Sequence, residues 1–190
     1  MGRRLVRGRR SLTEPVDPVA IAGVTFAPVE VHADRRGSFA ELYRRSRLAG
    51  APSMVQANLS RSEAGVLRGL HFHRRQSDLW VPAAGSAMAA LFDLREGSPT
   101  RGHAATFELD AARPSALYIP AGVAHGFAAT RPFSLLYLVD REYAGDDEWG
   151  VAWDDPDLGI DWPLADPVLS ERDRTNPPLR AVLRDPPRYG

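Results

Sequence analysis

Residues 65–85 read GVLRGLHFHRRQSDLWVPAAG, and residues 118–127 read YIPAGVAHGF. These two stretches contain the spacings G-x5-H-x-H-x4-D-x6-G and P-x-G-x2-H. Side chains alternate between the two faces of a β-strand, so we expect His71 and His73 to project to the same side. His125 follows a Pro-Gly turn that opens another strand. If the side that His71 and His73 share is the interior of a barrel, both lie in a cavity rather than in solvent.

Short extended segments separated by turns dominate the rest of the chain. We predict strands within residues 20–30, in a piece that follows a turn at Gly37, and at residues 65–73, 79–81, 86–93, 103–108, 116–119, 126–130 and 133–139. Turns are expected at residues 82–85, 96–100, 110–115, 120–122 and 130–132. Many short strands with regular turns indicate an all-β sandwich or jelly roll. In the first half of the chain one helix is expected, at residues 41–48, and the acidic, proline-rich text after Tyr143 predicts a loop-rich tail around the barrel.

Length and composition exclude several functional classes. A chain of 190 residues fits one domain, predicted at residues 18–180, with a mobile basic arm at 1–17 and a peripheral tail at 181–190. The formal net charge is zero, so nothing indicates a nucleic-acid partner. There are no cysteines, and all 24 basic residues are arginines, which excludes thiol nucleophiles and lysine Schiff bases. The basic opening is not followed by an apolar run, so we expect a cytoplasmic protein that does not contact membranes.

The paired spacings resemble the signature of the cupins, with Asp78 where that signature usually has glutamate. The resemblance implies a cupin jelly-roll barrel with short peripheral helices, in which His71, His73 and His125 face the interior. His71, His73, Asp78 and His125 would then form a set of three histidines and one carboxylate, which suits Fe(II), Mn(II), Ni(II) or Zn(II). A metal-dependent cupin is therefore one interpretation, and a hydrogen-bonded structural role is the alternative for any single histidine.

A narrower resemblance covers about residues 20–180. The chain is similar to the dTDP-4-dehydrorhamnose 3,5-epimerase family, which consists of cupin enzymes of deoxysugar pathways. The matching segments are DRRGSFAELY (34–43), QANLSRSEAGVLRGLHF (56–72), DLREGSPTRG (93–102), LYIPAGVAHGF (117–127), LLYLVD (135–140), WDDPDLGIDWPL (153–164) and LSERD (169–173). They occur in the order that the family has them.

The resemblance implies a cofactor-independent isomerase with three catalytic residues. The 4-keto group of a nucleotide sugar acidifies the protons on carbons 3 and 5, so epimerisation needs a base on one face and a proton donor on the other. The implied base is His71, oriented by Asp173, and the implied donor is Tyr137. The alternatives are a structural barrel tyrosine at position 137 and a surface carboxylate at position 173 paired with Arg172 or Arg174.

The resemblance also implies substrate contacts and a partner subunit. The implied substrate-binding residues are Arg36, Glu41, Gln56, Asn58, Arg68, His73, Asp78, His125 and Tyr143. Arg36 and Arg68 would hold the diphosphate, a task suited to guanidinium forks. Arg36 and Glu41 belong to a segment that usually reaches a neighbouring subunit, which implies a homodimer with N-terminal strand exchange. Arg36 could equally be a turn residue on a solvated rim.

Three departures from the family pattern affect the predicted cavity. His73 stands where the family usually has glutamine, and Glu142 replaces one of two aromatic residues, although Tyr143 remains. Asp78 stands where the family has a lysine close to the oxygen that becomes an enolate. Two unit charges ~4 Å apart interact by about 4 kcal/mol at an effective dielectric constant near 20. An ionised, uncompensated Asp78 should therefore slow enolisation severely.

The negative charge of Asp78 could be compensated in three ways. Arg74 or Arg75 could neutralise it, or its side chain could turn to the rim in an ordinary salt bridge. A metal ion bound at the four-residue set would restore positive charge, but it would occupy His71 and prevent it from acting as a base. Besides an epimerase and a metal-dependent cupin, a third function stays open: a non-catalytic cupin, or a repurposed one that acts on another small-molecule ketone.

Overall fold

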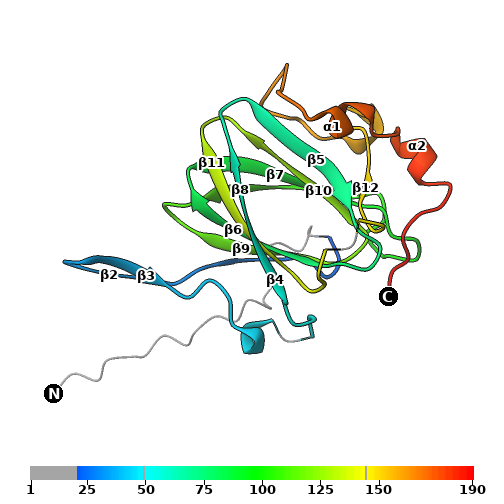
Figure 1. The fold of residues 1–190 in the computed structure, drawn as a ribbon. Coiled ribbons are helices and arrows are strands. Elements are labelled where there is room, and N and C mark those ends of the chain that lie inside the picture. Colours follow the sequence, from blue (N-terminus) through cyan, green and yellow to red (C-terminus); the bar gives the residue numbers. More distant parts are fainter. Residues whose placement is uncertain (1–20, 49, 144) are drawn as a thin grey trace.

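Two facing five-stranded sheets form the body of the molecule (Figure 1). This computed structural model describes residues 21–48, 50–143 and 145–190. The first sheet has the order β1 (Thr25–Pro28), β9 (Ser115–Ile119), β6 (Asp78–Ala84), β11 (Phe133–Val139) and β4 (Gln56–Ser62). The second has the order β12 (Trp149–Gly150), β5 (Val66–Phe72), β10 (Val123–Ala129), β7 (Ser86–Asp93) and β8 (Ala104–Asp110). All strand pairs are antiparallel, which confirms the predicted jelly roll.

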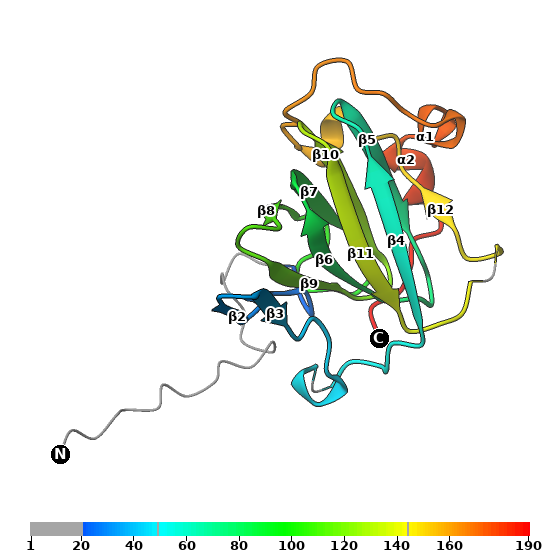
Figure 2. The ribbon, with the colours of Figure 1, turned by 60° about the vertical axis from the view of Figure 1, so that its left-hand side comes forward.

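The remaining elements lie outside the two sheets. They are the hairpin of β2 (Val31–Asp34) and β3 (Gly37–Ala40), the 3-10 helices η1 (Arg45–Arg47) and η2 (Pro156–Leu158), and the helices α1 (Glu171–Thr175) and α2 (Leu179–Val182). The hairpin projects away from the barrel, whereas α1 and α2 lie beside β5 and β12 (Figure 2). None of the described helices is long and apolar enough to cross a membrane.

Alternation along the strands distributes the apolar side chains over three clusters. The central cluster packs between the sheets beside the space left open there, and it includes Trp80, Phe127 and Phe133. On the outer face of the second sheet, Leu70 and Phe72 of β5 pack with the C-terminal tail. A third cluster on the first sheet packs against residues of the segment between β1 and β4. Because Leu70 and Phe72 point outward to the tail, His71 between them points to the interior, as the sequence predicts.

Several predicted boundaries were wrong. The helix expected at residues 41–48 is only the short η1. The turn expected at residues 82–85 is confined to Gly85, because β6 continues through Pro82 to Ala84. Pro82 lies opposite Leu135, where the register of the β6 and β11 pair shifts, and such irregularities accommodate proline in a sheet. The predicted arm at residues 1–17 lies outside the described part of the chain.

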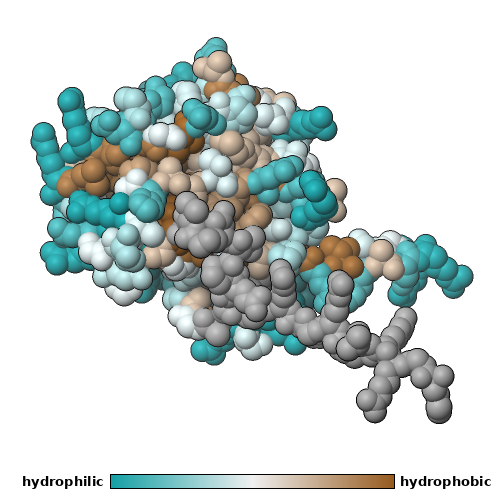
Figure 3. Space-filling model, turned by 180° about the vertical axis from the view of Figure 1, so that it is seen from behind, coloured by the Kyte–Doolittle hydropathy of each residue, from teal (hydrophilic) through white to brown (hydrophobic). Residues whose placement is uncertain are grey.

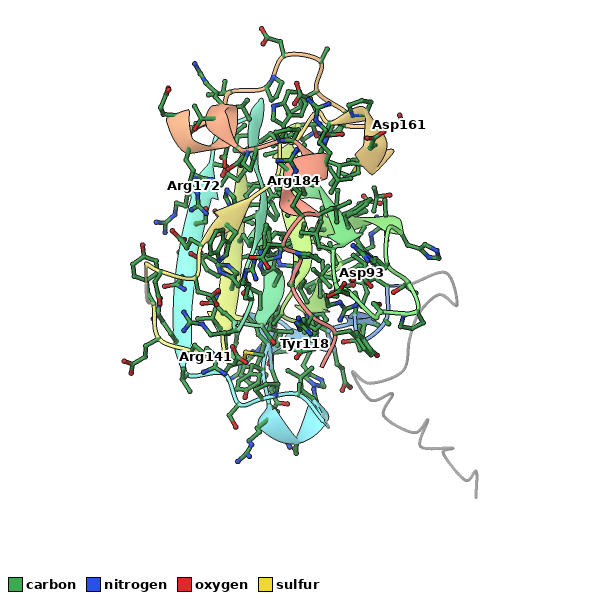
Figure 4. The ribbon with its side chains drawn as sticks, turned by 90° about the vertical axis from the view of Figure 1, so that its right-hand side faces the viewer. Asp93, Tyr118, Arg141, Asp161, Arg172 and Arg184 are labelled. Atoms are coloured by element: carbon green, nitrogen blue, oxygen red, sulfur yellow. The ribbon has the colours of Figure 1, made fainter. Side chains whose placement is uncertain are left out.

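A buried ion pair fixes the end of β7. Asp93 is fully buried and accepts hydrogen bonds from Arg95 Nε (2.8 Å), Arg95 Nη2 (2.8 Å), Ser98 Oγ (2.6 Å) and Thr100 Oγ1 (2.7 Å). Burial alone would raise the pKa of Asp93, but these hydrogen bonds outweigh burial, and the pKa is lowered. Asp93 therefore holds the loop of residues 95–100 in place (Figure 4).

We expect Asp93→Asn to lower the free energy of unfolding at neutral pH by about 3–5 kcal/mol, because Arg95 loses its buried counter-charge. A carboxyl whose pKa is lowered by folding contributes stability above its unfolded pKa of about 3.9 and loses it as the pH falls through the folded value. The difference between wild type and variant in urea unfolding should therefore shrink in acid. The exposed Asp161→Asn is the control. A pH-independent difference would contradict this account of Asp93.

Candidate active site

A cavity of about 460 Å³ lies between the two sheets. Its walls come from β4, β6 and β11 on one side and from β5 and β10 on the other, with Tyr143, Glu148 and α1 contributing as well. The lining residues are Gln56, Asn58, Ser60, Arg68, His71, His73, Gln76, Asp78, Trp80, His125, Phe127, Leu135, Tyr137, Val139, Tyr143, Glu148 and Arg172. The sequence predicted nine of these as site residues: Gln56, Asn58, Arg68, His71, His73, Asp78, His125, Tyr137 and Tyr143.

Close approach of two backbones positions the histidines in the second sheet. A Cβ on Gly69 would lie 2.7 Å from Gly126 Cα, and a Cβ on Gly126 would lie 2.7 Å from the Arg68 carbonyl oxygen. Glycine is therefore required at both positions for β5 and β10 to pair this closely. The same pairing places His125 directly opposite His71. The glycines of the two sequence stretches thus bring their histidines together.

His71 forms a dyad with Asp173. The Nε2 atom of His71 lies 2.5 Å from Oδ1 of Asp173, whose side chain is 3% exposed. Burial would raise the pKa of Asp173, but hydrogen bonding to His71, the attraction of that ring when protonated, and hydrogen bonding to Ser170 and the Gly69 backbone together lower the pKa. An ionised Asp173 can only accept, so Nε2 carries the proton and Nδ1 of a neutral ring has a free lone pair. The dyad therefore provides a base in the wall of the cavity.

The helix α1 holds Asp173 in this orientation. Ser170 caps the helix, since its hydroxyl accepts a hydrogen bond from the Asp173 backbone N–H at 3.1 Å. The two arginines that could have competed for Asp173 have other partners. Arg172 pairs with Glu148 at 3.0 Å, and Arg174 donates to the Leu169 carbonyl oxygen at 3.3 Å. The alternative of a surface carboxylate at position 173 is therefore wrong.

Asp173→Asn is expected to lower the rate of proton abstraction about 10²-fold, because the ring loses the charge that stabilises its protonated form. Affinity for a ligand of the cavity should change little, since Asp173 lies behind His71 rather than among the lining residues. Rates are followed by NMR and binding by calorimetry. Glu171→Gln, two residues away on α1 and exposed, is the matched control. Equal losses of rate and ligand affinity would contradict a positioning role.

Tyr137 enters the same cavity from the opposite sheet. It lies on β11, paired with Asn58 on one side and Trp80 on the other. Burial, together with the negative charges of Asp78 and Glu148, raises the pKa of Tyr137. The phenol is therefore protonated at neutral pH and can donate a proton. Because His71 and Tyr137 belong to facing sheets, they can approach opposite faces of a flat substrate.

Asp78 turns into the cavity and is only 3% exposed. Its Oδ1 accepts from Gln76 Nε2 at 2.9 Å, and its Oδ2 accepts from Trp80 Nε1 at 3.2 Å. The Nε2 atom of His125 lies 3.8 Å from Oδ2. Burial lowers the pKa of His125 to about 4, against the attraction of Asp78, so at neutral pH this ring carries no compensating charge.

Neither arginine proposed to neutralise Asp78 does so. Arg74 pairs with Asp185 at 2.8 Å and lies over the Trp149 ring, and Arg75 pairs with Asp146 at 2.9 Å. The salt bridge at the rim is also wrong, because Asp78 is buried. These arginines are directed outward because the Asp147 carboxylate accepts hydrogen bonds from both of their backbone N–H groups.

The four-residue metal set is not formed. Among the described residues, the group whose ligand atoms lie close enough to share an ion consists of His73, Asp78 and His125. His71 is outside this trio and is bound to Asp173. The base and a metal site are therefore not mutually exclusive in this chain.

Two predicted site residues lie away from the cavity. Arg36 sits at the exposed turn of the β2–β3 hairpin and pairs with Asp34 at 2.6 Å. Glu41 pairs with Arg44 and with Arg47, the latter at 3.1 Å. Neither Arg36 nor Glu41 is among the described residues that line the cavity. A role in substrate binding would require a second subunit.

Charged residues that the sequence did not reveal complete the cavity. Glu148 and Arg172 form an ion pair at 3.0 Å, and the Tyr143 hydroxyl lies 3.5 Å from Glu148. Figure 4 shows Arg172 on α1 beside the strands of the barrel. Arg172 could have been predicted from the sequence, because it directly precedes Asp173 and a neighbour of the dyad carboxylate must lie near the cavity. Nothing in the sequence distinguishes Glu148 from the other acidic residues of its segment.

Comparisons with known proteins agree with this arrangement. A family model described as dTDP-4-dehydrorhamnose 3,5-epimerase matches residues 18–181. The dTDP-4-dehydrorhamnose 3,5-epimerase of Pseudomonas aeruginosa is 42% identical over 164 residues, which cover 82% of this chain and 91% of that protein. The dTDP-4-dehydrorhamnose 3-epimerase of Streptomyces niveus is 39% identical over 165 residues, covering 83% of this chain and 80% of that protein.

A solved structure is similar over almost the whole chain. It is a 4-keto-6-deoxy sugar epimerase from the novobiocin biosynthetic gene cluster of Streptomyces spheroides, with a TM-score of 0.85 and 36% identity. The similarity covers 97% of this chain and 98% of that one. The fold and the sequence therefore point to the same group of proteins.

Proposed function

Because the chain belongs to the dTDP-4-dehydrorhamnose 3,5-epimerase family, we propose that it inverts carbon 3, carbon 5 or both in a dTDP-4-keto-6-deoxyhexose. The observation that carries this proposal is the pair of facing residues in one cavity, the His71–Asp173 dyad on one sheet and Tyr137 on the other. The reaction is an isomerisation in deoxysugar biosynthesis.

The chemistry follows from the two facing groups. His71 Nδ1 takes the proton from the carbon beside the keto group, the C–H electron pair becomes a C=C bond, and the π pair of the carbonyl moves onto the keto oxygen to give an enolate. Asp173 stabilises the imidazolium that results. The Tyr137 hydroxyl then gives its proton to the opposite face of the same carbon, which inverts the centre. Transfer of the proton from His71 to the phenolate, directly or through solvent, restores both groups.

The polar end of the cavity fits the nucleotide. Arg68 is held by hydrogen bonds from its Nε to Ser62 Oγ (3.0 Å) and from its Nη2 to the Arg61 carbonyl oxygen (3.2 Å). A guanidinium that is held in this way is suited to a diphosphate. Gln56 and Asn58 are joined by a hydrogen bond of 2.9 Å, and Gln56 Oε1 also accepts from the Tyr143 backbone N–H. We assign these residues to nucleotide-sugar binding, with Tyr143 stacking on the base.

Incubation with dTDP-4-keto-6-deoxyglucose in heavy water, followed by proton NMR, tests the proposal. Exchange and inversion at carbons 3 and 5 indicate a double epimerase, and exchange at carbon 3 alone indicates a monoepimerase. The relatives include both kinds, so similarity does not choose between them. Absence of exchange while the ligand is bound would overturn the proposal and favour a non-catalytic or repurposed cupin.

The family membership and the β2–β3 hairpin together support a homodimer. The hairpin carries Phe39, 69% exposed, with the exposed His32 opposite it on the same face. Apolar surface is visible on this projecting segment (Figure 3). Exchange of such hairpins would cover these side chains and bring Arg36 and Glu41 toward the partner's cavity. Exposed apolar patches of this kind commonly mark interfaces.

We expect the wild-type chain to sediment as a dimer and Phe39→Asp to sediment as a monomer at the same concentration, because a buried carboxylate at the interface lacks a partner. Ser38→Asp is the matched control, since its side chain points to the other face of the hairpin. A monomeric wild type, or an unchanged dimer in Phe39→Asp, would contradict this assembly.

Two further predictions accompany the function. A cytoplasmic location can be checked by fractionation of the source cells. The domain limits at residues 18–180 can be checked by limited proteolysis of the full chain, which should leave a resistant fragment close to those bounds.

A further inference from the structure

Three buried or half-buried side chains of the cavity converge beside the dyad. They are His73, Asp78 and His125, and each offers one ligand atom within 4.8 Å of the others. The His125 Nε2 to Asp78 Oδ2 distance of 3.8 Å is close to the ~3.4 Å that separates two ligands of a tetrahedral ion with bonds of about 2.1 Å. A small movement of the side chains would let one ion reach all three.

Hydrogen bonds to the backbone orient both imidazoles for this purpose. His73 Nδ1 lies 2.6 Å from the Asp147 carbonyl oxygen, and His125 Nδ1 lies 2.9 Å from the Val123 carbonyl oxygen. A carbonyl can only accept, so Nδ1 is the donor in each ring, and Nε2 of each neutral ring has a free lone pair. Metal-binding histidines are fixed in the same manner, with one nitrogen donating to a carbonyl and the other facing the ion.

The Asp78 carboxylate also has oxygen lone pairs available for a metal ion. Gln76 and Trp80 each donate one hydrogen bond to Asp78, which leaves further lone pairs on both oxygens. Arg74 and Arg75 are engaged with Asp185 and Asp146, so neither supplies positive charge to Asp78. A buried carboxylate facing a cavity generally requires a cation, a proton or a metal ion.

We infer that His73, Asp78 and His125 bind a first-row divalent metal ion, such as Zn(II), in the wall of the cavity beside His71. Two imidazoles and one carboxylate are a ligand set used by zinc and non-haem iron sites. His71 keeps its bond to Asp173 and its role as the base. When bound, the ion would offset the charge of Asp78 where the substrate carbonyl becomes an enolate. Only this last consequence rests on the proposed function; binding itself does not.

Calorimetric titration of ZnCl2 into the full-length, untagged, chelator-treated chain tests the binding. The wild type should take up one Zn(II) per chain. His73→Asn, Asp78→Asn and His125→Asn should each lower the affinity at least about tenfold, since even the loss of an outer hydrogen-bond partner of a ligand costs ~10–100-fold. His71→Asn is the matched control and should bind as the wild type does. A cobalt-soaked crystal should show its anomalous peak among the trio, which guards against misfolded variants.

Three results would overturn the site: no saturable binding by the wild type, undiminished affinity in Asp78→Asn, or loss of binding in His71→Asn. The consequence for catalysis is tested separately in heavy water. Deuterium exchange into the substrate should be faster with Zn(II) than after chelation in the wild type, and this difference should disappear in Asp78→Asn. Zinc binding without any gain in exchange would overturn the charge-offset role alone. Exchange without zinc binding would overturn the site and leave the epimerase proposal standing.

Discussion

His71→Asn should slow deuterium incorporation at carbon 3 of dTDP-4-keto-6-deoxyglucose by about 10²- to 10⁴-fold, the usual contribution of a positioned general base. Asparagine has no lone pair that takes up a proton at neutral pH, so the enolate can form only by slow abstraction by water. The dissociation constant for dTDP should stay close to that of the wild type, because His71 faces the sugar rather than the nucleotide in the proposed mode of binding. Exchange is followed by proton NMR and dTDP binding by calorimetry.

His103→Asn is the control for this experiment. His103 is exposed, on the loop between β7 and β8, and it is not among the residues that line the cavity. Its variant should exchange as fast as the wild type. If His71→Asn kept wild-type exchange while His103→Asn behaved normally, the base would have to be another group, and the assignment of the His71–Asp173 dyad would be abandoned.

Tyr137→Phe should separate proton exchange from inversion. His71 is still able to remove the proton and return a deuteron to the same face, so exchange with retained configuration should continue. Inversion needs a donor on the other face, and its rate should fall by about 10²- to 10⁴-fold. Ligand affinity should change little, because phenylalanine preserves the shape of the side chain in the wall of the cavity. Product configuration is read by NMR and affinity by calorimetry.

Tyr189→Phe provides the matched control, since Tyr189 is 44% exposed and stacks with Arg95 rather than facing the cavity. It should epimerise at the wild-type rate. Parallel losses of affinity and inversion in Tyr137→Phe would indicate a role in binding alone. Simultaneous loss of same-face exchange would show that Tyr137 takes part in proton removal, contrary to the assignment of the two faces.

Local sequence patterns predicted the barrel and the interior position of the histidines. Alternation places His71 and His73 on one face, and the glycines at positions 69 and 126 allow the close pairing that sets His125 opposite His71. The contact between His71 and Asp173 spans 102 residues, so no local pattern contains it. It was predicted only through the resemblance to the family, which supplied the order of the distant segments.

The surroundings of Asp78 could not be predicted from neighbouring residues. Arg74 and Arg75 are close to Asp78 in sequence, but they are drawn outward by Asp146, Asp147 and Asp185. Those carboxylates belong to the acidic segment and the C-terminal tail, whose placement depends on packing against the finished barrel. For the same reason the sequence did not reveal the Glu148–Arg172 pair at the cavity.

The central claim is that a base held by Asp173 and an acid on the facing sheet lie on opposite sides of one sugar carbon. A crystal structure of the chain with a dTDP-hexose bound tests it most directly. We expect His71 Nδ1 to lie within about 3–3.5 Å of carbon 3 or carbon 5, with the Tyr137 hydroxyl on the other face of the ring. A structure with both groups on the same face, or with Asp173 turned away from His71, would contradict it.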